Sequence, residues 1–194
     1  MNKKDILNII PEHKKQHSQN VVETALKIAA CHDVDEEKTF YAGLMHDIAK
    51  DQTPEKMIKE NIPVSNILKE IYRHYKPIYH AYAAPIFVKT KLGIFDETIL
   101  NAIKWHTTGR PAMTKLEQII YVSDYIEPGR EHVGIDFIKN LAYASLDKAC
   151  YLVSVCSVQY LLKTAKRIHP ATIRCRKYYL ERIEEADLEK LHRV

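Results

Sequence analysis

The chain has 194 residues, of which 46% are hydrophobic and 28% are charged, and its formal net charge is +4 with neutral histidines. This length suits one domain with a sizeable core, and the charge is too small to indicate a nucleic-acid partner by itself. The longest uncharged run, from Ala149 to Leu162, has 14 residues, fewer than a membrane span needs. The start of the chain lacks the apolar core of a signal peptide, and the cysteines show no CxxC spacing. We therefore expect a cytoplasmic protein with reduced thiols and no membrane partner.

Helical periodicity dominates the chain, and no stretch alternates with a period of two residues. Helices are expected over residues 18–30, 36–49, 54–60, 65–72, 79–91, 96–106, 115–126, 136–166 and 171–191. Within this series we expect Pro85 to kink a helix, Gly93 to end one and Asp96 to cap the start of one. The sequence thus predicts an all-α fold of one domain, residues 1–194, with its core over about 15–130 and a helical C-terminal extension over about 136–194.

Histidines and aspartates recur along these helices in an order that is typical of a metal site. Six residues make up the set: His17, His46, Asp47, His80, His106 and Asp124. Asp47 lies among apolar neighbours, where an unpaired carboxylate is costly, and a metal ion would remove that cost. Imidazole and carboxylate ligands without thiolates suit iron, manganese or zinc at a hydrolytic centre. The simpler alternative is that His46 and Asp47 form a buried hydrogen-bonded pair, since a single histidine on an apolar helix face is usually a core residue.

Four segments of the chain resemble one family. They are the His46-Asp47 dipeptide, the Ala-rich segment that begins at His80, the run His106-Thr-Thr-Gly-Arg-Pro111 and the run Ser123-Asp-Tyr-Ile-Glu-Pro-Gly-Arg130. They are similar to the HD-domain metal-dependent phosphohydrolases, and more narrowly to the bacterial branch that cleaves diadenosine tetraphosphate symmetrically to two ADP. The similarity covers about residues 17–130, has a weaker echo at His169-Pro170-x-Thr172, and includes every ligand position. It implies an HD-domain helical bundle.

The resemblance also implies a centre of two divalent or mixed-valence metal ions, with iron favoured over manganese, cobalt and zinc. The first ion would be held by His17, His46, Asp47 and Asp124. The second would share Asp47 as a bridge and add His80 and His106. A hydroxide between the ions would attack an inner phosphorus of the nucleotide and release ADP. No nucleic-acid partner is expected, because the basic residues show no recognised motif.

Further residues are assigned to catalysis and to the substrate. Lys50 follows Asp47 by three residues, so it faces the ligands and is assigned to the phosphates or the leaving oxygen. Arg130, after a Pro-Gly turn, is a candidate phosphate clamp. We therefore predict that Asp47, Lys50 and Arg130 take part in catalysis. The predicted substrate contacts are His17, Lys50, Thr107, Asp124, Arg130, Arg167, His169 and Thr172.

Several assignments stay open in the sequence. Tyr72, Tyr75, Tyr79 and Tyr82 suit the core better than adenine stacking, and His132 suits a surface loop better than a phosphate contact. The apolar run 151–162 is a candidate homodimer face. Two other functions compete with the first: an HD phosphohydrolase acting on a nucleoside monophosphate, a cyclic nucleotide or a guanosine alarmone, and a non-catalytic helical module with a structural metal.

Overall fold

The structure is a computed structural model that describes residues 6, 9–10, 12–131, 134–185 and 187. Within these residues it contains helices and no strand, which confirms the predicted all-α fold class. The helices are α2 (Glu12–His32), α3 (Glu36–Met45), α4 (Pro54–Lys59), α5 (Asn66–His74), the short 3₁₀ helix η1 (Lys76–Ile78), α6 (Tyr79–Phe87), the π-helical turn η2 (Val88–Leu92), α7 (Glu97–Trp105), α8 (Lys115–Ile126), α9 (Ile135–Ala144), α10 (Leu146–Lys163) and α11 (Pro170–Leu180). In the described part of the chain, no helix is long and apolar enough to cross a bilayer.

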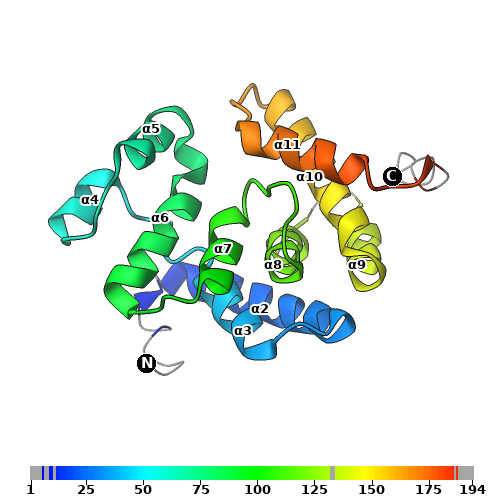
Figure 1. The fold of residues 1–194 in the computed structure, drawn as a ribbon, viewed down its shortest axis with the longest axis horizontal. Coiled ribbons are helices and arrows are strands. Elements are labelled where there is room, and N and C mark those ends of the chain that lie inside the picture. The colour runs from blue at the N-terminus through cyan, green and yellow to red at the C-terminus, as the bar shows by residue number, and fades with distance from the viewer. Residues whose placement is uncertain (1–5, 7–8, 11, 132–133, 186, 188–194) are drawn as a thin grey trace.

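Helix α8 lies at the centre of the molecule, with α2 and α3 along one side, α4 to α6 at one end and α9 to α11 at the other (Figure 1). It packs against α2, α7 and α10, and α7 packs in turn against α3 and α6. Apolar side chains from these helices, such as Ile28, Ile103 and Ile119, are fully buried and form one continuous core. The same central packing brings together α2, α6 and α8, each of which carries a predicted metal ligand.

Most helices begin at a residue whose side chain accepts a hydrogen bond from the first turn. Asp96 accepts from the backbone N–H groups of Thr98 and Ile99, which confirms its predicted capping role. Asp35 and Thr53 cap α3 and α4 in the same way. Polar caps of this kind offset the unpaired N–H groups of a first turn and explain why these helices begin where they do.

Four predicted helix boundaries are wrong. The helix predicted over 18–30 already begins at Glu12. The second error concerns the dipeptide His46-Asp47. The helix predicted over 36–49 ends at Met45, and tight turns follow, with the amide of Ile48 bonded to the carbonyl of Met45 at 3.1 Å. The imidazole Nδ1 of His46 lies 2.7 Å from the carbonyl oxygen of Gly43. In a continuing α-helix that oxygen would accept from the amide of Asp47, so the side chain of His46 competes with the next helical hydrogen bond.

The other two boundaries lie in the C-terminal extension. The single helix predicted over 136–166 is split into α9 and α10 at Ser145, whose backbone is extended and whose hydroxyl accepts from the amide of Lys148. The helix predicted over 171–191 ends at Leu180 and is followed by turns; residues 186 and 188–194 lie outside the described residues. Gly93 adopts the left-handed conformation and ends η2, as predicted, while Pro85 lies inside α6.

Gly109 provides a test of how tightly α11 packs on the loop that follows α7. Its φ is +60°, and a Cβ atom added there would overlap Sγ of the fully buried Cys175. Gly93 has a similar φ of +65° but nothing within 4 Å of the same position. We expect Gly109→Ala to lower the free energy of unfolding by about 2–5 kcal/mol, and Gly93→Ala, its matched control, by about 1–2 kcal/mol. Urea denaturation measures both, and equal losses in the two variants would contradict this packing.

Candidate metal centre

His17, His46 and Asp124 bring three possible ligand atoms together from separate parts of the chain. His17 lies on α2, His46 directly follows α3, and Asp124 lies on α8. Nε2 of His17 is 3.1 Å from Nε2 of His46 and 3.2 Å from Oδ1 of Asp124. Oδ2 of Asp47 lies 3.8 Å from Nε2 of His17 and 3.9 Å from Nε2 of His46. These atoms surround one position at which a metal ion fits.

The other oxygen of Asp47 belongs to a second group. Its Oδ1 is 3.0 Å from Nε2 of His80 and 3.6 Å from Nε2 of His106, and these two nitrogens are 3.2 Å apart. His80 is the second residue of α6, and His106 follows the last residue of α7. Because each oxygen of Asp47 faces a different group, its carboxylate can bridge two ions. All six residues of the predicted set therefore lie together in the structure.

Hydrogen bonds to the outer nitrogens orient three of the imidazoles. Nδ1 of His46 is 2.7 Å from the carbonyl oxygen of Gly43, and Nδ1 of His106 is 2.6 Å from that of Ile103. A carbonyl only accepts, so each Nδ1 carries the proton and each Nε2 has a free lone pair directed at the centre. Nδ1 of His17 is 3.2 Å from a carboxylate oxygen of Glu127. Such contacts behind a ligand fix its tautomer and orientation.

Glu127 is a residue of this site to which the sequence prediction gave no role. Its carboxylate is almost completely buried and accepts from Asn20 at 2.9 Å and from the amide of Gly129 at 2.6 Å. Burial acts to raise the pKa of Glu127, but these hydrogen bonds and His17 lower it. The spacing carries a signal, because Glu127 follows Asp124 by three residues and so shares its side of the helix end.

The charges of the centre match those needed to bind a cation. Burial lowers the pKa of His46 and of His80 to about 4, so both imidazoles are neutral at pH 7. Burial acts to raise the pKa of Asp47, but the neighbouring imidazoles hold it well below its usual range. The pKa of Asp124 is also lowered, against the effect of burial, by its hydrogen bond with His17. Neutral imidazoles and ionised carboxylates are the forms that coordinate divalent metals, and these four residues fit such ions. Burial acts to lower the pKa of His17, but its hydrogen bond with Asp124 raises it, so a metal ion would displace a proton there more often than at His46 or His80.

Two cationic residues, Lys50 and Arg130, border the centre. Nζ of Lys50 lies 3.1 Å from Oδ1 of Asp47 and 3.1 Å from Nε2 of His80. Arg130 places Nη2 2.7 Å from Oδ1 of Asp124 and Nε 3.1 Å from its backbone carbonyl. Both side chains are more than a third exposed, Lys50 at 35% and Arg130 at 38%. Each cation is thus paired with a candidate metal ligand and also reaches solvent.

A cavity of about 570 Å³ opens beside the centre, and we call it the first cavity. Six of the eight predicted substrate contacts line it: Thr107, Asp124, Arg130, Arg167, His169 and Thr172. The hydroxyl of Thr107 is buried without a hydrogen-bond partner, so it is available to a ligand. His169 caps α11 through its Nδ1 and packs edge-on against Tyr75. The C-terminal extension therefore supplies one wall of a cavity whose other wall carries His106.

A second cavity, of about 380 Å³, lies at Lys50 and His80. Its lining residues are Lys50, Asp51, Gln52, Thr53, Tyr72, Lys76, Pro77, Tyr79 and His80. Neither cavity is lined by His17, the remaining predicted substrate contact.

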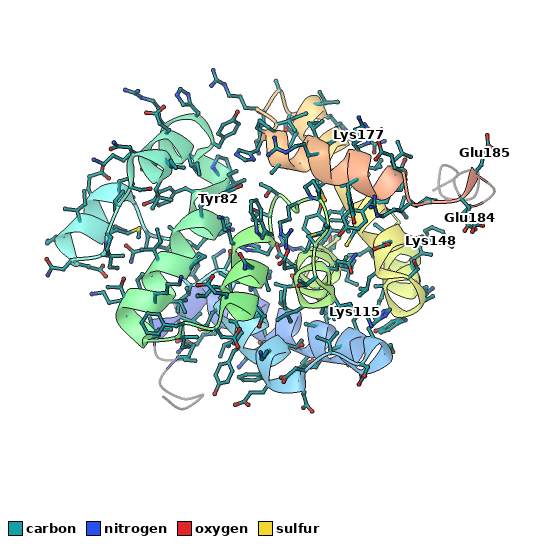
Figure 2. The ribbon with its side chains drawn as sticks, viewed as in Figure 1. Tyr82, Lys115, Lys148, Lys177, Glu184 and Glu185 are labelled. Atoms are coloured by element: carbon teal, nitrogen blue, oxygen red, sulfur yellow. The ribbon has the colours of Figure 1, made fainter. Side chains whose placement is uncertain are left out.

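The sequence left four tyrosines open between packing in the core and stacking on adenine, and the structure places them in different surroundings. Tyr75 lines the first cavity, Tyr72 and Tyr79 line the second, and Tyr79 is also buried. Tyr82, labelled on α6 in Figure 2, lines neither; its ring lies 5.7 Å from Trp105 and 5.6 Å from His169. His132 lies outside the described residues.

Arg110 has a structural partner that the motif 106–111 does not reveal. Its Nε and Nη2 donate to the two carboxylate oxygens of Glu117 at 2.7 and 2.8 Å. Glu117 is 1% exposed, so the pair neutralises a buried charge at the start of α8. The arginine of this motif therefore anchors the loop after α7 to the helix that carries Asp124.

Comparison with known proteins identifies the family. Residues 15–129 match the HD domain family. A Staphylococcus aureus protein named bis(5′-nucleosyl)-tetraphosphatase, symmetrical, is 38% identical over 88% of each chain. A Bacillus subtilis protein of the same name is 35% identical over 84% of this chain and 87% of its own. A solved structure is also similar: the crystal structure of a predicted HD superfamily hydrolase involved in NAD metabolism from Clostridium acetobutylicum. The two sequences are 36% identical, the match covers 94% of this chain and 99% of the other, and the TM-score is 0.83. The chain therefore belongs to the HD-domain family and, within it, to the symmetrical bis(5′-nucleosyl)-tetraphosphatases.

Proposed function

We propose that this protein hydrolyses diadenosine tetraphosphate to two ADP at a two-metal centre. The observation that carries the proposal is the carboxylate of Asp47, whose Oδ2 faces His17 and whose Oδ1 faces His80, within overlapping triads of possible ligands. Relatives that share 35–38% of their residues with this chain over most of its length are named for this activity. The first cavity supplies the space beside the ligands that a nucleotide needs.

The six ligands divide between the two ions in this proposal. His17, His46 and Asp124 hold the first ion, His80 and His106 hold the second, and Asp47 bridges them. When bound, the ions activate water and neutralise charge on the phosphates. We propose iron as the native metal, while manganese, cobalt and zinc also suit a set of imidazoles and carboxylates.

The residues around the centre bind and orient the nucleotide. Lys50, beside Asp47 and His80, contacts the phosphate chain and offsets the charge that develops on the leaving ADP. Arg130 holds Asp124 in place and directs its exposed edge at a phosphate. The free hydroxyl of Thr107 donates to the same chain.

The far end of the first cavity takes a nucleoside diphosphate. Arg167, His169 and Thr172 contact the nucleotide there, where they line the cavity with Tyr75. The loop at Arg167 and the start of α11 thus complete a site whose ligands lie on the earlier helices. This shared lining supports our proposal that residues 1–194 act as one domain.

The exposed end of α10 and the free cysteines bear on the assembly and the location of the protein. The run 151–162 is only partly available to a partner, because Tyr151 is buried while Tyr160 and Leu162 are 56% and 65% exposed. We propose a homodimer through the exposed Leu162 at this end of α10, and not through Tyr160, which lines the first cavity. The mass of the protein in solution tests this proposal. The described cysteines are free thiols, which supports a reducing compartment such as the cytoplasm.

Product analysis tests the reaction. Incubated with diadenosine tetraphosphate and added iron, manganese or cobalt, the protein should yield ADP as its sole nucleotide product, and a chelator should abolish turnover. Chromatography separates ADP from AMP and ATP. AMP together with ATP would mean attack at an outer phosphorus, and no turnover with any metal would favour another phosphate ester or a structural metal.

Replacement of the bridging residue tests the centre. Asp47→Asn keeps the side-chain shape but leaves one carbonyl oxygen, which cannot serve two ions as a carboxylate does. We expect the variant to bind no more than half of the metal that the wild type binds and to lose turnover at least a hundredfold. Elemental analysis and steady-state kinetics measure both quantities.

The matched control for that experiment is Asp136→Asn, an exposed aspartate in the first turn of α9 that lines neither cavity. It should keep full metal content. If Asp47→Asn bound as much metal as this control while remaining helical by circular dichroism, the bridging role would be wrong.

A further inference from the structure

We infer that the second cavity binds the nucleoside of the second ADP half of the substrate. The inference rests on the proposed function, because it assigns the half of diadenosine tetraphosphate that the first cavity leaves unplaced. It gives each cavity one ADP unit and places the scissile bond between them at the metal centre.

The two cavities meet at the metal ligands. His106 lines the first and His80 lines the second, and their Nε2 atoms are 3.2 Å apart. Pro77 of η1 lines both cavities, so this short helix forms the ridge between them. A ligand that extends from one cavity into the other past His80 and His106 therefore crosses the centre.

The substrate has the matching form. Its four phosphates join two identical nucleosides, and symmetrical hydrolysis breaks the bond between the two inner phosphates. With an inner phosphorus at the metals, equal lengths of the molecule extend in two directions. The oxygen of water forms a new bond to one inner phosphorus, the bridging oxygen leaves with the other half, and two ADP result. A single cavity on one side of the centre would leave half of this molecule in solvent.

The second cavity offers the groups that a nucleotide end requires. Tyr72 is half-buried and rests edge-on against Tyr79 at 4.9 Å, and the Tyr79 hydroxyl donates to the sulfur of Met57. This support holds the ring of Tyr72 in place as a surface for a base. Nζ of Lys76 lies 5.4 Å from the centre of that ring. The first cavity contains a similar pair, with Nζ of Lys166 4.9 Å from the centre of the Tyr160 ring.

Hydrogen-bond acceptors complete the second cavity. Oε1 of Gln52 is buried and has no hydrogen-bond partner within the described residues. Asp51 adds an exposed carboxylate on the same side. Acceptors of this kind suit an exocyclic amine or ribose hydroxyls, while Lys50 and Lys76 suit phosphate. The volume of about 380 Å³ falls within the usual range for small-ligand sites.

The experiment compares two substrates that differ only at one end. Adenosine 5′-tetraphosphate has the same four phosphates as diadenosine tetraphosphate but a single nucleoside, and its central cleavage gives ADP and pyrophosphate. Tyr72→Leu should lower kcat/KM for diadenosine tetraphosphate roughly tenfold, the scale of a lost base stack, and should change kcat/KM for adenosine tetraphosphate less than twofold.

Three further variants make the comparison specific. Gln52→Ala should lower kcat/KM several-fold for diadenosine tetraphosphate alone, and it should fold normally because it removes an unpaired buried acceptor. Tyr160→Leu, in the first cavity, should lower kcat/KM for both substrates, since each has one nucleoside to place there. Tyr143→Leu, on α9 and in neither cavity, is the control and should affect neither.

The outcomes separate this inference from the proposed function. If the wild type does not convert diadenosine tetraphosphate to ADP, both are wrong. If it does, but Tyr72→Leu and Gln52→Ala slow both substrates equally or neither, the second cavity does not bind the nucleoside while the proposed function stands. Selective loss with the two-nucleoside substrate in both variants would support the inference.

Discussion

The carboxylate of Asp47 is the group on which the rest of this structure depends. It is 5% exposed, and its two oxygens face two different sets of imidazoles. Burying an ionised carboxylate is costly unless charge and hydrogen bonds compensate it. Here the partners come from α2, α6, the end of α7 and the residue before Asp47 itself. The packing of these helices around α8 therefore serves both the core and the centre.

The ends of α3 and α7 position two of the candidate metal ligands. His46 and His106 each follow the last residue of a helix, and each directs Nδ1 at the carbonyl three residues earlier. That contact fixes the tautomer and leaves Nε2 facing the centre. It also frees the following residue from helical geometry. Asp47 and Thr107, which follow these histidines, thereby reach the centre and the first cavity.

The sequence predicted the parts of this site that residue type and spacing encode. The six candidate ligands, Lys50 and Arg130 could be named because the resemblance covers them and because their neighbours are apolar. The end of α3 at Met45 could not, since it depends on a side-chain contact of His46 that helical periodicity does not register. The role of Glu127 depends on His17, which is distant in the sequence, and the three-residue spacing from Asp124 indicates only the side of the helix end on which Glu127 lies. The pairing of Arg110 with Glu117 depends on how the loop after α7 folds back onto the start of α8, which the motif itself does not encode. The division of the extension at Ser145 was a local signal, a capping serine inside an apolar run, that the pattern of hydrophobic residues concealed.

The most direct test of the two-ion centre is the anomalous diffraction of crystals grown with manganese, measured on the high-energy side of its absorption edge. If Asp47 bridges two ions, each chain should show two anomalous peaks, roughly 3.5–4 Å apart. One should lie among His17, His46 and Asp124, the other should lie beside His80 and His106, and each should contact a different oxygen of Asp47. A single peak, or two peaks of which only one contacts Asp47, would contradict the bridging carboxylate.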